Sequence, residues 1–254
     1  MTKLENPPLI EAIFELRWGE SAPGQFSYSQ DEQSLFAGKV SASAASKGYG
    51  LTEYVHQNPV ALPMAATHRF RSKKDVWPCF QVGLGLFTVN QTKNGYGWSS
   101  FKASVKSGLE IYNQAEPNKL NSVKNSLVLA LRYQDGFFPE QGDSIEEYLA
   151  EHFKVKAGLP NSFLDTDSLD RAKSGVHLNI RVESKKPKGS VVITVANAII
   201  NGQPGLLMET IVESKVSDAL QGQIDIDSIL EWAGEAHDLQ KHSFKTLISP
   251  SAYK

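Results

Sequence analysis

Apolar and polar residues alternate near the start of the chain, directly after Pro7 and Pro8. The two prolines disfavour a helix and favour an extended backbone at this point. The apolar positions are Ile10, Ala12, Phe14, Leu16 and Trp18, and the positions between them hold Glu11, Ile13, Glu15 and Arg17. A period of two predicts a β-strand with one buried face and one mostly polar face.

Three longer segments repeat apolar residues at helical spacing. They are residues 29–47 with Phe36, Val40 and Ala44, residues 98–114 with Phe101, Val105 and Leu109, and residues 227–248 with Ile229, Ala233 and Ala236. Ser29 or Asp31 can cap the first of these helices. A shorter helix is expected over residues 144–152, where Ser144 and Glu147 have the spacing of a capping box.

The remaining periodic segments predict further strands, and short turn sequences separate them. The strand segments are residues 51–55, the neighbourhood of His68 and Phe70, and residues 80–87, 127–133, 176–182, 191–196 and 206–212. Asn94-Gly95 and Asn201-Gly202 are typical turn dipeptides. The strands therefore follow one another in meanders and do not alternate with helices.

This order of elements predicts an α+β fold. We expect antiparallel sheet in meanders, helices packed on one face of it, and a long C-terminal helix. No linker rich in Pro, Gly or Ser divides the chain. Residues 1–254 are therefore expected to form a single composite domain of two α+β halves, with a soft boundary near residues 118–122.

Composition and charge are those of an ordinary globular protein. The 254 residues carry 26 basic and 28 acidic side chains, a net charge of -2, which gives the whole chain no preference for a polyanionic partner. No apolar run approaches the roughly 20 residues of a membrane helix, and Met1 to Asn6 lack the apolar core of a signal peptide. Cys79 is the single cysteine, so an intrachain disulfide is excluded. We expect a protein of the bacterial cytoplasm with no contact to the membrane.

Four segments together carry a family-like pattern. Asn6 to Arg17 reads N-P-P-L-I-E-A-I-F-E-L-R, and a strand from Gln81 to Asn90 leads to Tyr96-Gly97-Trp98-Ser99-Ser100-Phe101. Leu131-Arg132-Tyr133-Gln134-Asp135 and the stretch from Leu230 through Ala236-His237-Asp238 to Phe244 complete the set. These segments resemble a sporadically distributed, uncharacterised prokaryotic family whose members open with N-P-P-[IVL]-x-E-A-[IV]-[FV]-E-[IL]-R.

The resemblance implies a genomic context and says little about a biochemical activity. The family's patchy distribution is similar to that of genes on mobile or anti-phage defence islands, which implies an accessory or regulatory role in such a system. Two short stretches, Lys73-Lys74-Asp75 and Trp77-Pro78-Cys79, depart from the family pattern.

A magnesium-dependent nuclease is the enzyme that the sequence favours most. Glu183-Ser184-Lys185 and Glu213-Ser214-Lys215 both place E-x-K at the end of a predicted strand. With an upstream aspartate, such a pair can hold Mg²⁺ and orient a water molecule. Asp165, Asp167 or Asp170 would complete the set, and the alternative site is Asp170, Glu183 and Lys185. Both copies also precede predicted turns, where charged side chains are common, so this three-residue pattern has an ordinary structural explanation as well.

Two basic stretches make nucleic-acid or nucleotide sensing the other alternative. The residues are Arg69, Arg71, Lys73 and Lys74 in the first stretch, and Lys185, Lys186 and Lys188 in the second. Basic loops of this kind can follow a phosphate backbone, and lysines also protect the edges of sheets. The sensor requires the two stretches to share one concave surface.

Other chemistries lack their motifs. Gly83-Leu84-Gly85 begins a dinucleotide fingerprint, but Thr88 stands where the third glycine belongs. None of the histidines has zinc spacing, so no metal and no cofactor are expected. Cys79 is expected to fill space beside Trp77 and Phe80. Glu11, Glu15 and Arg17 form a charged strand face that we expect to be solvated or paired with Arg132.

We therefore predict a non-enzymatic binding protein. Its partner would be another protein or a second copy of the chain, with nucleic acid as an alternative partner. The aromatic residues expected at the surface are Trp77, Tyr96, Phe137 and Phe138. Aromatic side chains are typical anchors of protein interfaces.

Overall fold

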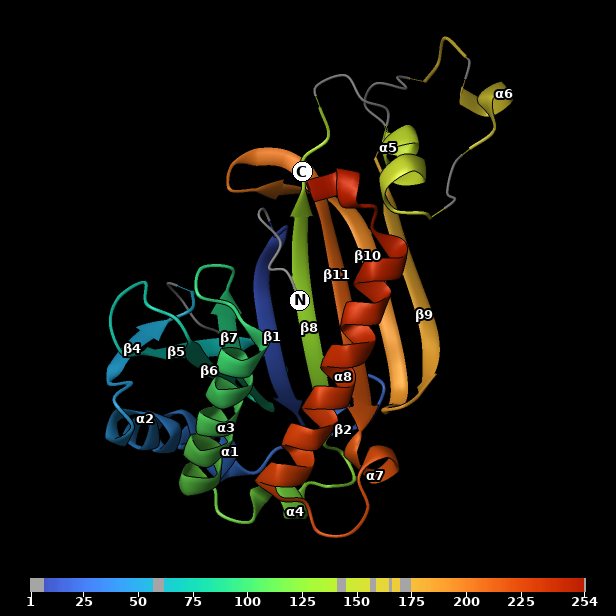
Figure 1. The fold of residues 1–254 in the computed structure, drawn as a ribbon. Coiled ribbons are helices and arrows are strands. Elements are labelled where there is room, and N and C mark those ends of the chain that lie inside the picture. The colour runs from blue at the N-terminus through green and yellow to red at the C-terminus, as the bar shows by residue number, and fades with distance from the viewer. Residues whose placement is uncertain are drawn as a thin grey trace.

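A nine-stranded antiparallel sheet forms the centre of the molecule. The computed structural model describes residues 7–56, 62–140, 145–155, 159–164, 166–169 and 175–253. Within these residues the strand order is β4-β5-β6-β7-β1-β8-β11-β10-β9. The strands of the large sheet are β1 (Leu9–Arg17), β4 (Leu51–Tyr54), β5 (Ala66–Arg71), β6 (Cys79–Gly83), β7 (Leu86–Thr92), β8 (Val128–Phe137), β9 (His177–Lys185), β10 (Lys188–Ile200) and β11 (Gln203–Lys215). The predicted α+β fold with antiparallel meanders is confirmed (Figure 1).

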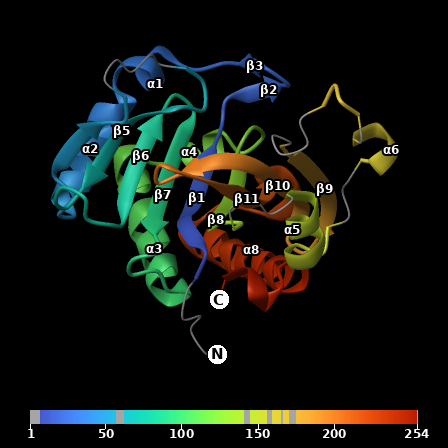
Figure 2. The same cartoon turned by 90° about the horizontal axis from the view of Figure 1, so that it is seen from above.

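The helices cover one face of this sheet. The longest are α3 (Trp98–Ala115) and α8 (Ile226–Leu247), which lie side by side on that face, with α2 (Phe36–Ser46) next to α3 (Figures 1 and 2). The shorter elements are α1 (Gln30–Ser34), α4 (Lys119–Ser122), α5 (Ile145–His152), α6 (Asn161–Leu164), α7 (Val216–Ala219), the 3-10 helix η2 (Pro250–Tyr253) and a small hairpin of β2 (Glu20–Ala22) and β3 (Gln25–Phe26). Among the described helices, none is both long and apolar enough to cross a bilayer.

The first predicted strand is the central one. β1 pairs with β7 on one side and with β8 on the other, so it joins the two halves of the chain in a single sheet. Ala12, Phe14, Leu16 and Trp18 are buried beneath the helices, as their spacing predicts. A bulge interrupts the pairing between Leu9 and Glu11. Because a bulge inserts an extra residue, Leu9 enters the core and Ile10 is only partly buried, contrary to the simple alternation.

Capping residues and apolar spacing predicted most boundaries of the longer helices to within two residues. Ser29 caps α1 through a capping box with Glu32, and α3 and α8 fall within two residues of their predicted limits. The helix expected over residues 29–47 is divided at Leu35 into α1 and α2. α5 begins at Ile145, and Ser144 lies outside the described residues.

The expectation of one strand over residues 80–87 is wrong. The chain turns at Leu84-Gly85, and Gly83 pairs with Leu86, so that β6 and β7 form a hairpin. Gly85 has φ +73, a conformation that glycine adopts without steric strain. The turn shifts the core-facing positions from even residue numbers in β6 to odd ones in β7, so the alternation predicted for one strand ends at the turn.

Candidate functional site

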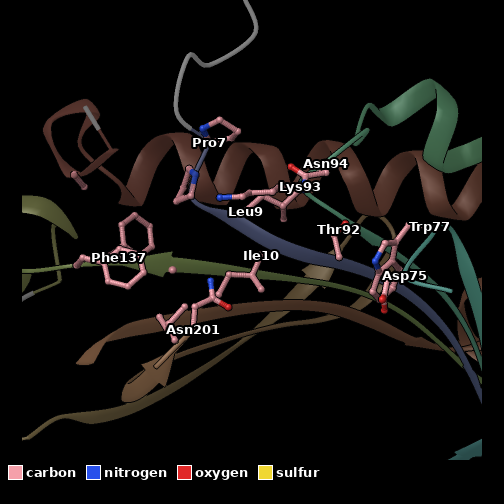
Figure 3. Close-up of a pocket in the computed structure, with 15 residues that line it drawn as sticks. Pro7, Leu9, Ile10, Asp75, Trp77, Thr92, Lys93, Asn94, Phe137 and Asn201 are labelled. Carbon is pink, nitrogen blue, oxygen red and sulfur yellow. The ribbon is translucent and has the colours of Figure 1, made fainter. Parts of the chain in front are cut away.

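An open cleft of about 660 Å³ lies at the end of the sheet where β1 begins. Its walls come from the start of β1, the β5–β6 loop, the end of β7, the end of β8 and the β10–β11 turn. Figure 3 shows Ile10 in the middle of the cleft, Trp77 and Asp75 at one end, and Phe137 at the other. A volume in this range is typical of ligand-binding clefts.

Apolar side chains form one side of the cleft. A β-carbon added to Gly136 would lie 3.0 Å from Cδ1 of Ile10 and 3.2 Å from Cδ1 of Ile200. One added to Gly205 would lie 3.3 Å from Cδ1 of Ile200 and 3.3 Å from Cδ1 of Phe138. The three side chains are therefore neighbours above two glycines. Phe138 remains 49% exposed, so part of this apolar surface faces solvent.

Trp77 forms the opposite wall, and arginines support it from behind. The guanidinium carbon of Arg71 lies 4.9 Å from the centre of the indole ring, and that of Arg69 lies 6.0 Å away. Arg71 is itself held by Asp75 at 3.1 Å and by Glu53 at 3.5 Å. Cation–π contacts of this kind orient an aromatic ring, so the indole is positioned before any partner arrives.

Polar residues surround the apolar centre of the cleft. They are Asp75, Thr92, Lys93, Asn94 and Asn201. Among the described residues, the rim thus carries one acidic and one basic side chain, together with neutral hydrogen-bonding groups. This arrangement suits a neutral or mixed polar partner better than a polyanion.

The four predicted aromatic residues differ in exposure. Trp77, Phe137 and Phe138 all line the cleft, although they come from two distant parts of the chain. The expectation that Phe137 is a surface residue is wrong. Phe137 is 1% exposed and packs against Phe153 with ring centres 4.7 Å apart, and Tyr96 is only partly exposed with its hydroxyl turned inward.

Tyr96 belongs to a second polar cluster, beneath α3 and α8. Its hydroxyl lies 2.7 Å from that of Tyr133, which in turn lies 3.0 Å from Nδ1 of His237. Trp98 stacks on the His237 ring at 4.0 Å. Burial, together with the charge of Lys241, lowers the pKa of His237 to about 4, so the imidazole is neutral at pH 7. The residues in the three family-like segments after the first strand therefore meet in space.

The charged face predicted for β1 continues across the sheet. Arg132 Nε lies 2.9 Å from Glu15, and Arg17 Nη2 lies 2.7 Å from Glu213. Glu209 and Arg181 extend this ladder, 3.0 Å from Arg132 and 2.8 Å from Glu213 respectively. Asn90 donates a hydrogen bond of 2.8 Å to Glu11. The predicted pairing with Arg132 is confirmed, but Glu15 is only 5% exposed and is not solvated.

The two basic stretches lie apart. Arg69 and Arg71 are in β5 and Lys73 and Lys74 follow it, next to the cleft, whereas Lys185, Lys186 and Lys188 flank the β9–β10 turn. Six strands separate β5 from β9 in the sheet. The register also places the β9–β10 turn near Arg17, at the opposite end of β1 from the cleft. Lys186 pairs with Glu235 of α8 at 3.1 Å.

The glutamates of the two E-x-K sequences contact arginines, whereas the carboxylates of a metal site would coordinate the ion. Both carboxylate oxygens of Glu213 accept from arginines, Arg17 and Arg181. Burial opposes the ionisation of Glu213, but these arginines outweigh it and lower the pKa. The Glu183 side chain is 81% exposed and lies 3.6 Å from Arg181. Asp167 is exposed, and Asp165 and Asp170 lie outside the described residues.

In the described part of the chain, no group of three His, Cys, Asp or Glu residues could hold a metal ion. Cys79 is buried, and this burial raises the pKa of its thiol to about 11. The thiol is therefore protonated at neutral pH and is a poor nucleophile.

The sequence did not indicate that Ile10, Ile200, Asn94 and Asn201 line the cleft. The only local signals were the two Asn-Gly turns, which place asparagines at the ends of strands.

Comparison of the chain with protein-family models, with curated proteins and with solved structures finds no match.

Proposed function

We propose that this chain acts by binding a partner protein, whose apolar anchor side chain enters the cleft between Trp77 and the Ile10–Phe138 side. The observation that supports this most is the convergence of Ile10, Trp77, Phe138 and Ile200 from separate parts of the chain at one open cleft. A buried aromatic anchor with polar residues around it is the usual composition of a protein interface.

The orientation of Trp77 supports the same proposal. Because Arg69 and Arg71 hold the indole ring, little side-chain entropy remains to be lost on binding. The nearby rim offers amide and hydroxyl groups of Asn94, Asn201 and Thr92 for hydrogen bonds to a partner backbone. Through the family resemblance, the proposal extends to an accessory role in an anti-phage defence or mobile-island system.

The alternative functions have less support from the described residues. A sensor of nucleic acid would use Arg69, Arg71, Lys73 and Lys74 without Lys185, Lys186 and Lys188, which lie at the far edge of the sheet. A magnesium-dependent nuclease would need Glu183 and Lys185 to recruit further ligands, such as Asp170, for which the structure describes no position.

Affinity capture with cleft variants tests the proposal. The wild-type chain and Trp77→Ala and Phe138→Ala variants are immobilised and exposed to extract from the source organism, and retained proteins and nucleic acids are identified. We expect a protein that the wild type retains and both variants lose. Isothermal titration with that protein should show binding weakened at least about tenfold in each variant, as expected when an anchor side chain is removed.

Tyr54→Ala is the matched control. Tyr54 is an aromatic residue with 66% exposure on β4, outside the cleft, and its replacement should leave capture unchanged. Phe138→Ala keeps the test informative if Trp77→Ala loses its fold. Retention of the same protein by both cleft variants, or retention of RNA or DNA alone, would contradict the proposal.

A further inference from the structure

The strands at the two edges of the large sheet differ in length. β4 at one edge has only four residues, which limits its use as a template for another strand. β9 at the other edge has nine residues, contains no proline, and pairs with β10 in an uninterrupted register from Lys185 to His177. No described strand pairs with the outer side of β9, and Figure 1 shows it at the margin of the sheet.

The helix-side face of β9 is apolar and, in the described part of the chain, only partly covered. Val182 pairs with Val191, and Ile180 pairs with Ile193, so these residues lie on the buried face of the sheet. Nevertheless Ile180 is 40% exposed and Val182 is 54% exposed. Helix α8 packs over β8 and β11, and its cover does not extend as far as the edge. A long, regular strand with exposed branched apolar residues is a site for intermolecular strand pairing.

We propose that β9 pairs antiparallel with β9 of a second copy of this chain, about a two-fold axis at Ile180. The second copy is the favoured occupant because the sequence of β9 is complementary to its own reverse in this register. Residues that face each other in an antiparallel pair share one side of the sheet. Ile180 then meets Ile180 of the other copy, and Leu178 meets Val182 twice.

The polar side of β9 supports the same register. With the axis at Ile180, Glu183 faces His177 and Arg181 faces Asn179, so no like charges oppose each other. An axis at Arg181 would place two arginines opposite each other, which is unfavourable. An axis at Val182 would pair Ile180 with Ser184 and Asn179 with Lys185, and would lose the apolar contacts of Ile180 and Leu178.

Cysteine cross-linking tests both the interface and its register. The native Cys79 is buried, so a new exposed cysteine is the reactive thiol. Opposed Cα atoms in an antiparallel pair lie about 4.5–5.5 Å apart, a separation that a disulfide spans. We expect Ile180→Cys to form a covalent dimer under mild oxidation. Val182→Cys should remain uncross-linked, because residue 182 of one copy faces residue 178 of the other, four positions away from that copy's residue 182.

Sedimentation equilibrium measures the assembly without cross-linking. The wild-type chain should have about twice the 27.9 kDa mass of the monomer, and Ile180→Asp should have the monomer mass with an unchanged circular dichroism spectrum. Leu51→Asp is the matched control, since Leu51 is 36% exposed on the opposite edge, and it should remain dimeric.

Three results would overturn the inference. They are a monomeric wild type at about 100 μM, a dimer that persists in Ile180→Asp, and a cross-link at position 182 in place of 180. If Ile180→Asp does not fold, the two cysteine variants still decide between the registers. The inference does not depend on the proposed function of the cleft.

Discussion

Glu15 illustrates how a charged residue becomes buried on the polar face of a sheet. Its carboxylate lies 2.9 Å from Arg132 and 3.4 Å from Arg17, one on a neighbouring strand and one on its own. The long arginine side chains cover the carboxylate, and its own pairing offsets part of the cost of removing it from water. At the scale of single residues, the neighbours therefore decide whether a polar position is exposed.

Asp135 is a buried carboxyl group without such a partner among the described residues. Its Oδ2 atom is buried, with no described group at hydrogen-bonding distance, and burial raises the pKa of Asp135 from 3.8 to about 7. Between about pH 4 and pH 7 the folded protein therefore holds this proton while the unfolded chain has lost it. The contribution of Asp135 to the free energy of unfolding thus decreases as the pH rises through this interval.

We expect Asp135→Asn to stabilise the protein relative to the wild type more at pH 8 than at pH 5. The difference between the two pH values should be roughly 2–3 kcal/mol, since about two pH units separate pH 5 from the pKa of Asp135 and one unit corresponds to about 1.4 kcal/mol. Urea denaturation at both pH values measures it. Asp167→Asn, at an exposed aspartate, is the matched control and should show little change. An Asp135→Asn effect independent of pH would contradict the assignment.

The β6–β7 hairpin shows why element boundaries escape a periodic pattern. Apolar residues alternate along the sequence from Phe80 to Leu86, but the chain reverses direction at Leu84-Gly85, and the core-facing residues of β7 are Phe87 and Val89. Gly83 lies against the backbone of Ala65, and a β-carbon there would overlap the Ala65 carbonyl oxygen. At the scale of elements, the close approach of β6 and the segment before β5 therefore requires glycine at this position.

Replacement of Gly83 by Ala should destabilise the protein by roughly 2–3 kcal/mol, because the backbone of one segment must move to remove the overlap. The midpoint of thermal or urea unfolding measures the effect. Gly38→Ala is the matched control: Gly38 is exposed inside α2, and nothing lies within 4 Å of the added β-carbon. It should instead stabilise the protein by about 0.5–1 kcal/mol. Equal effects of the two changes would contradict this account.

The whole molecule is held together by β1. This strand from the start of the chain lies between β7 and β8, and the buried core runs from Val40 in α2 to Trp232 in α8. Without β1, both β7 in the first half and β8 in the second half would lose one of their two neighbouring strands. We therefore expect the two halves to unfold as one cooperative unit.

Calorimetry tests this expectation directly. The described structure predicts one transition, with a van't Hoff enthalpy close to the calorimetric enthalpy. Gly83→Ala, which alters only the first half, should shift the entire transition to lower temperature. Two resolved transitions, of which only one moves in Gly83→Ala, would show that the halves are independent domains.

Sequence periodicity by itself determined the helices, most strands and their buried faces, because a period of two or of 3.6 follows directly from local backbone geometry. It also identified Trp77 and Phe138 as candidate contact residues and Arg132 as the partner of the charged strand. The tertiary structure alone decided that Ile10 joins them, that Phe137 is core, and that β9 is left at an edge. These outcomes depend on strand order, on the bulge after Leu9 and on the reach of α8, which are set by contacts between distant segments and leave no local pattern in the chain.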